Sequence, residues 1–108
     1  MPAENFSPDT GSFITLSTAE DMVADWVSNF GPASNSNPKA TAFGSNKIQD
    51  ILDQSGCVGL RIYNGYDDGN RKLVIVGVDE DGNDLTGGYI LDAGSPCPPM
   101  CAPNNSIN

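Results

Sequence analysis

The chain has 108 residues, of which 38% are hydrophobic, and it contains 12 glycines and 8 prolines. This length predicts a single domain with a modest core. The 14 acidic and 5 basic residues give a net charge of −9. Such a surface repels phosphates and anionic lipid, which argues against nucleic acid as a partner. The sequence contains no apolar stretch long enough to span a membrane.

The N-terminal residues MPAENFSPDTGSF lack the basic and apolar regions of a Sec-type signal. We therefore expect a cytoplasmic protein, or one exported by a route that leaves no mark in the sequence. In a reducing compartment the three cysteines would remain thiols.

A first helix is predicted over residues 18–30, after a polar and irregular segment 1–16. Ser17 and Glu20 have the spacing of a capping box, in which each side chain accepts the other residue's backbone amide. Gly31-Pro32 ends the helix. The apolar residues of one helical face follow the cap at helical spacing: Met22, Val23, Trp26, Val27 and Phe30.

Residues 32–38 have the composition of a linker, and a short turn is predicted at 38–43. A second helix follows at about 46–54, capped by Ser45 and ended by Gly56. Its apolar residues share one face, and we expect both helices to pack on a sheet formed by the rest of the domain.

Residues 57–79 contain two apolar runs joined by Asp67-Asp68-Gly69-Asn70, which predicts a β-hairpin with a four-residue loop. In this register Ile62 faces Ile75. A second turn at 80–83 leads to a third strand that includes residues 89–91. The predicted fold is α+β, with two helices packed on a three-stranded antiparallel β-meander. This domain covers residues 17–92 and is followed by an irregular tail rich in proline, residues 93–108.

Strand 72–78 is apolar on both faces, which predicts a central strand. Two helices can cover only one face of the sheet. The predicted register places Tyr89 beside Val74, and Val74 beside Tyr63. The tail or another protein could cover this second face, or it could remain a mildly hydrophobic surface. Its residues form a candidate interaction face: Tyr63, Val74, Val76 and Tyr89.

The chain contains no histidine. This removes Ser–His and Cys–His nucleophile pairs, His-ligated zinc and the commonest general base near neutral pH. The acidic residues of the two helices lie mainly on their polar faces, where we expect them to be solvated. The sequence therefore predicts no catalytic residue and no cofactor.

The acidic loop 79–84 invites comparison with a calcium site. Counted from Asp79, however, the EF-hand glycine position is Asp84 and the bidentate glutamate position is Ile90. The pattern favours a hairpin turn whose charges protect the apolar strand before it from aggregation. A calcium-binding module at this loop is the third hypothesis.

Cys97 and Cys101 enclose two prolines and a methionine, a spacing that suits a local disulfide or a soft-metal site. Cys57 begins the first strand, and it can join the pair only if the tail runs back across the sheet. Three interpretations stay open: a structural disulfide or paired thiols, inert cysteines, or a metal or redox site formed by Cys97 and Cys101 with Cys57.

Three sequence elements occur in the order Q-S-G-C-V-G-L-R-I-Y at 54–63, V-G-V-D-E-D-G-N-D-L at 76–85 and C-P-P-M-C at 97–101. With this order, residues 48–101 resemble a group of small uncharacterised proteins from Bacteroidota. The resemblance implies no activity. It does imply that Cys57, Cys97 and Cys101 belong to one arrangement.

The leading hypothesis is a non-enzymatic structural or protein-interaction subunit. We expect it to associate with a protein partner or with itself, through the second sheet face and the C-terminal tail. The runner-up is a thiol-based metal-binding or redox protein that uses Cys97 and Cys101, with Cys57 as a further ligand.

Overall fold

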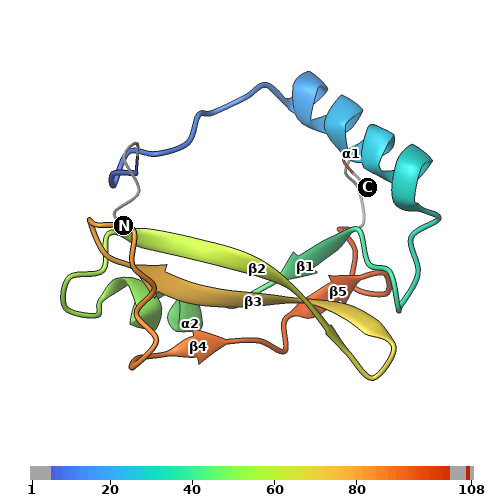
Figure 1. Cartoon of the computed structure of the whole chain (residues 1–108). Coiled ribbons are helices and arrows are strands. Elements are labelled where there is room, and N and C mark those ends of the chain that lie inside the picture. The colour runs from blue at the N-terminus through green and yellow to red at the C-terminus, as the bar shows by residue number, and fades with distance from the viewer. Residues whose placement is uncertain (1–5, 103–106, 108) are drawn as a thin grey trace.

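Two helices and five strands make up the computed structural model, which describes residues 6–102 and 107 (Figure 1). The strands β2, β3 and β4 form one antiparallel sheet in that order, and β1 pairs with β5. The predicted α+β fold with a three-stranded antiparallel meander is confirmed. The elements are α1 (Leu16–Phe30), β1 (Ala40–Ala42), α2 (Ser45–Leu52), β2 (Gly59–Asp67), β3 (Asn70–Val78), β4 (Ile90–Leu91) and β5 (Ser95–Cys97).

The β2–β3 hairpin has the predicted register, with Ile62 opposite Ile75. Its loop is shorter than predicted, because Asp67 pairs with Asn70 and leaves two residues in the turn. These two, Asp68 and Gly69, have positive φ angles of 50° and 81°. Two such residues in a row make the type of tight turn whose twist matches the flanking strands. The shorter loop leaves the register unchanged because it closes around the same central position.

Helix α2 packs directly on the sheet through Ile51, its buried residue. A Cβ atom on Gly77 of β3 would lie 3.2 Å from the Ile51 Cγ2 atom, so the glycine gives the helix room to approach. The helix begins at Ser45, and Gly44 occupies the cap position where Ser45 was predicted. The buried core residues of the described chain are Ile51, Ile75, Val76, Val78 and Cys97.

Helix α1 begins earlier than predicted, because Thr15 provides the N-cap. The Thr15 hydroxyl accepts the Thr18 amide at 3.1 Å, so the predicted Ser17–Glu20 capping box is not the start of the helix. No residue of α1 is buried. Figure 1 shows α1 set apart from the sheet, whereas α2 lies against it. Two contacts hold the end of α1: Asn37 donates a hydrogen bond to the Phe30 carbonyl at 2.7 Å, and Trp26 lies beside Arg71.

Two segments predicted to be irregular form a small sheet instead. The predicted turn at 38–43 contains β1, and the predicted irregular tail contains β5. Ala40 lies opposite Cys97, and the Lys39 amide donates to the Cys97 carbonyl at 2.8 Å. Pro96 is tolerated in β5 because both strands of a two-stranded sheet are edge strands. The described start of the tail therefore packs beside β1 and does not cross the second face of the larger sheet.

The third strand has a different register from the predicted one. Ile90 lies opposite Val76, and the predicted placement of Tyr89 beside Val74 is wrong. An isolated bridge joins Val78 to Asp84, and the chain between the bridge and β4 leaves the sheet. The side-chain oxygen of Gln54, just after α2, accepts the Tyr89 amide at 2.9 Å. This hydrogen bond replaces the strand partner that Tyr89 was predicted to have.

Candidate functional site

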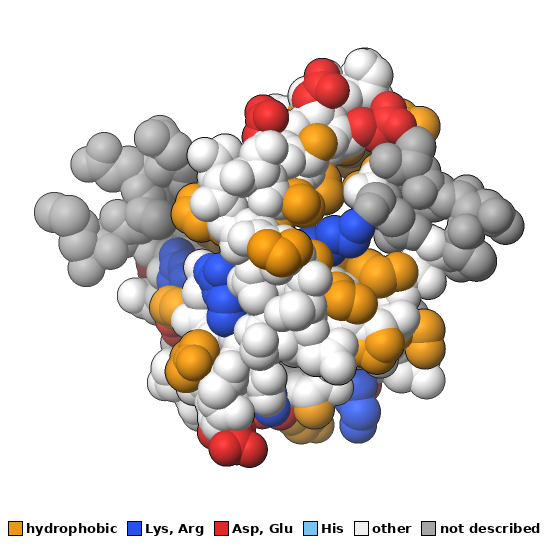
Figure 2. Space-filling model, turned by 90° about the vertical axis from the view of Figure 1, so that its right-hand side faces the viewer, with side chains coloured by type: hydrophobic (Ala, Val, Ile, Leu, Met, Phe, Trp, Pro, Cys, Tyr) orange, Lys and Arg blue, Asp and Glu red, His pale blue; other side chains and the backbone are white. Residues whose placement is uncertain are grey.

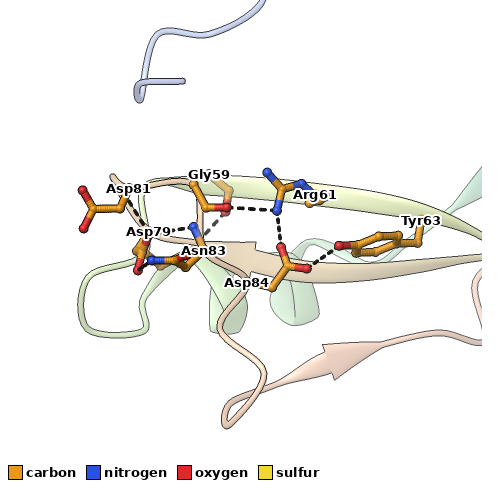
Figure 3. A network of polar contacts seen from close by, with 9 residues as sticks. Gly59, Arg61, Tyr63, Asp79, Asp81, Asn83 and Asp84 are labelled. Carbon is orange, nitrogen blue, oxygen red and sulfur yellow. Dashed lines mark hydrogen bonds and ion pairs between the residues drawn. The ribbon is translucent and has the colours of Figure 1, made fainter. Parts of the chain in front are cut away.

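A polar cluster of Arg61, Tyr63 and Asp84, hereafter the Arg61–Asp84 cluster, ties β2 to the loop after β3 (Figure 3). Arg61 and Tyr63 are alternate residues of one strand and therefore point to the same face. Arg61 donates to the Gly82 carbonyl at 3.1 Å and to one carboxylate oxygen of Asp84. The Tyr63 hydroxyl donates to the other oxygen of that carboxylate. The side chain of Asp84 is 20% exposed, so water still reaches the cluster.

The electrostatics of this cluster keep Asp84 ionised. The hydrogen bond from Tyr63, assisted by the hydrogen bond and charge of Arg61, lowers the pKa of Asp84 despite partial desolvation. The same hydrogen bond to Asp84 raises the pKa of Tyr63. Neither group is therefore poised to exchange a proton near neutral pH. The cluster is suited to fastening the 79–84 loop to β2 and not to acid–base chemistry.

Asp79, at the start of the acidic loop, uses its carboxylate to shape the loop itself. One carboxylate oxygen accepts the amides of Asp81 at 3.0 Å and Asn83 at 2.9 Å (Figure 3). This is the local bonding by which aspartate stabilises turns. Glu80 and Asp81 are exposed. The loop carboxylates do not converge, and among residues 6–102 and 107 no group of three acidic or cysteine side chains could hold a metal ion.

The three cysteines do not form one arrangement. Cys97 and Cys101 are joined by a disulfide, with their Cα atoms 4.8 Å apart. Cys57 is free and half-buried, and its thiol donates to the Gly59 carbonyl at 3.3 Å. It lies over Gly77, where an added Cβ would come within 2.9 Å of the sulfur. The tail pairs with β1 and so does not carry Cys97 and Cys101 back to Cys57, which leaves the three-cysteine metal site unformed.

The predicted interaction face is divided in the structure. Val76 is only 4% exposed and belongs to the core, while Val74 is half-buried. Tyr63 and Tyr89 are exposed, but the register of β4 separates Tyr89 from Val74. On the same face a Cβ at Gly59 would lie 2.8 Å from the Phe6 ring, so the N-terminal segment covers this end of the sheet. The sequence had suggested the tail or a partner as that cover.

A set of exposed apolar side chains lies instead in the N-terminal segment and α1. We call it the N-terminal apolar surface, and its members are more than half exposed: Phe13, Ile14, Leu16, Met22 and Phe30. Sequence reasoning missed it because helical periodicity predicts an apolar face without telling what covers that face.

No protein-family model, no curated protein and no solved structure matches the chain. No helix in the described part of the chain is long and apolar enough to cross a membrane. The site must therefore be judged on its own geometry, which offers structural polar contacts and an exposed apolar surface.

Proposed function

We propose that the protein is a non-enzymatic structural or interaction subunit that binds a protein partner. The observation that carries the proposal is the N-terminal apolar surface, where Leu16, Met22 and Phe30 of α1 are 58%, 60% and 61% exposed. Exposed apolar patches on small domains commonly mark protein-binding surfaces. This location replaces the tail as the main contact, because the described start of the tail pairs with β1.

The geometry of α1 is that of an amphipathic helix, which suits binding in an apolar groove of a partner protein. At helical spacing, Leu16, Met22 and Phe30 lie within the same stripe as the half-buried Val23, Trp26 and Val27. The chain's own fold therefore covers only part of this stripe. Burying the exposed remainder of each large side chain would contribute on the order of 1 kcal/mol.

Charge favours a different protein over a second copy of this chain. Helix α1 carries Glu20, Asp21 and Asp25 and no lysine or arginine. Two copies of the chain would each carry a net charge of −9, and this like charge opposes their association. The partner that fits has an apolar groove with basic residues at its rim.

The test compares the wild type with a variant carrying Met22→Gln and Phe30→Gln. Both side chains are exposed, so we expect the variant to keep its fold. Quantitative pull-down from native lysate should recover a partner with the wild type and lose it with the variant. Tyr66→Gln, which replaces an exposed residue of the β2–β3 hairpin, is the matched control and should retain the partner. Equal recovery by all three proteins, or a wild type that binds nothing and stays monomeric in light scattering, would contradict the proposal.

The two other hypotheses have less support. A thiol-based metal site needs Cys57 near Cys97 and Cys101, and a calcium site needs carboxylates that converge at 79–84. Neither arrangement is present among the described residues. The cytoplasmic location stays a prediction. The Cys97–Cys101 disulfide argues against it, because disulfides persist mainly in oxidising compartments.

A further inference from the structure

Two adjoining cavities lie at the end of the molecule that carries the β2–β3 turn. Their volumes are about 330 and 160 Å³, and they share the lining residues Thr41, Arg71, Lys72 and Leu73. Pro96 and Pro99 from the tail line one side of the larger one. Its volume falls at the lower end of the range for small-molecule sites. Figure 2 looks onto this side, where basic and hydrophobic side chains lie together near the middle and acidic ones lie mainly at the top and bottom.

The lining of these cavities is positively charged, unlike the chain as a whole. Three of the five basic residues line them, namely Lys39, Arg71 and Lys72, and none of the acidic residues in the described part of the chain does. Lys72 also approaches the exposed Asp67 of the turn at 3.8 Å, a surface pair of the kind that contributes little. At physiological salt, charges are screened over about 8 Å. The basic residues that line the cavities, together with the neighbouring Asp67, therefore set the potential that a ligand meets here, and the more distant acids contribute little.

Arg71 is held in place before any ligand arrives. Its amide donates to the Ser36 carbonyl at 3.0 Å, and its guanidinium donates to the Asn37 side-chain oxygen at 3.0 Å. The guanidinium carbon lies 5.9 Å from the centre of the Trp26 ring. The bond to Asn37 uses one of the five N–H groups of the guanidinium. A planar cation fixed in this way is suited to binding a carboxylate.

We propose that these cavities bind a small organic anion, namely a carboxylate attached to an apolar body. The carboxylate lies at Arg71 and Lys72. The apolar body lies in the larger cavity against Leu73, Pro96 and Pro99. The pairing of β1 with β5 and the Cys97–Cys101 disulfide hold the proline wall in position. This binding site is separate from the N-terminal apolar surface and goes beyond the proposed function.

The test is a titration of the full chain with phenylacetate, followed by the backbone amide signals in NMR spectra. Acetate lacks the apolar body and phenylacetamide lacks the charge, so both serve as matched ligands. We expect saturable shifts at Thr41 and Gly94 with phenylacetate, and binding at least about tenfold weaker for the other two.

Three variants make the test specific. Arg71→Gln should weaken phenylacetate binding at least about tenfold, while Lys47→Gln should change it less than about twofold. Both remove one positive charge, but Lys47 lies on α2 and does not line either cavity. Because Arg71 also contacts Trp26, Lys72→Gln is the second variant, and we expect it to weaken binding about threefold or more. The amide spectra of each variant report whether its fold is intact.

In these titrations, three results would overturn the proposal. They are the absence of any saturable shift at millimolar phenylacetate, equally strong binding of phenylacetamide, and an equal loss of binding in the Lys47→Gln and Arg71→Gln variants. A peptide whose C-terminal carboxylate binds far more tightly than phenylacetate would assign the site to a protein partner and would also overturn it.

Discussion

Truncation of Ile51 should cause a large loss of stability. This side chain joins α2 to the sheet, is 1% exposed and is the buried residue of its helix. Changing a buried isoleucine to alanine costs about 2–5 kcal/mol, and changing it to valine costs about 0.5–1.5 kcal/mol. Domains of this size have roughly 5–15 kcal/mol of stability in total. Since the described core has only five buried hydrophobic residues, Ile51→Ala should remove a large share of it.

Urea denaturation and thermal melting both measure this loss. A change of 1 kcal/mol shifts the melting temperature of a small domain by about 4–8 °C. We therefore expect Ile51→Ala to melt on the order of 12–24 °C below the wild type, taking a loss of about 3 kcal/mol. The next residue of the same helix provides the matched control. Leu52 is exposed, and Leu52→Ala should cost much less than Ile51→Ala.

The same measurement on α1 tests whether the two helices differ as the structure indicates. Met22→Ala alters an exposed side chain and should change the free energy of unfolding by no more than about 0.5 kcal/mol. If Met22→Ala destabilised the protein as much as Ile51→Ala, α1 would be part of the core and the N-terminal apolar surface would not exist. A cost below about 1 kcal/mol for Ile51→Ala would show that α2 is not docked on the sheet.

Two further predictions concern the Arg61–Asp84 cluster and the cysteines. The pKa of Asp84 lies below its ordinary value of 3.8 in the folded chain. Its contribution to stability is therefore complete above that value and is lost as the pH falls through the lower folded pKa. The melting temperatures of wild type and Asp84→Asn should differ near neutral pH and converge in acid, and a constant difference would contradict the assignment. Alkylation of the unfolded protein without reductant should modify one thiol, that of Cys57, and alkylation after reduction should modify three thiols. Modification of three thiols without reductant would mean that Cys97 and Cys101 do not form a disulfide.

The elements that sequence analysis predicted well are those fixed by neighbouring residues. The β2–β3 hairpin depends on a turn between two adjacent apolar runs, so its register follows from local sequence alone. The β1–β5 pair joins Ala40 to Cys97, which are separated by about half of the chain, through two three-residue strands. Strands so short have no periodic pattern to detect. The register of β4 likewise depends on Gln54, which is remote in sequence from its partner Tyr89.

The candidate site was predictable to a smaller extent. Arg61 and Tyr63 could be placed on one face from strand alternation, but their partner Asp84 was assigned only to a turn. The error came from the predicted register of the third strand, which treated residues 85–89 as regular strand. The spacing of Cys97 and Cys101 allowed a local disulfide, whereas the position of Cys57 depended on the path of the tail. Pairings between residues distant in sequence determine the register of β4 and the path of the tail, and the sequence alone does not predict such pairings.

The structure separates the residues that stabilise the chain from those proposed to bind. The core consists of Ile51 on α2, three residues of β3 and Cys97, whereas α1 contributes no buried residue. Substitutions at Met22 and Phe30 should therefore change partner binding without changing stability, and those at Ile51 should do the reverse. Trp26 is the exception, since it lies on α1 and also lines the smaller of the two cavities beside Arg71. A change at Trp26 would disturb the position of α1 and the anion site together, so the two proposals are tested independently only by variants that leave it intact.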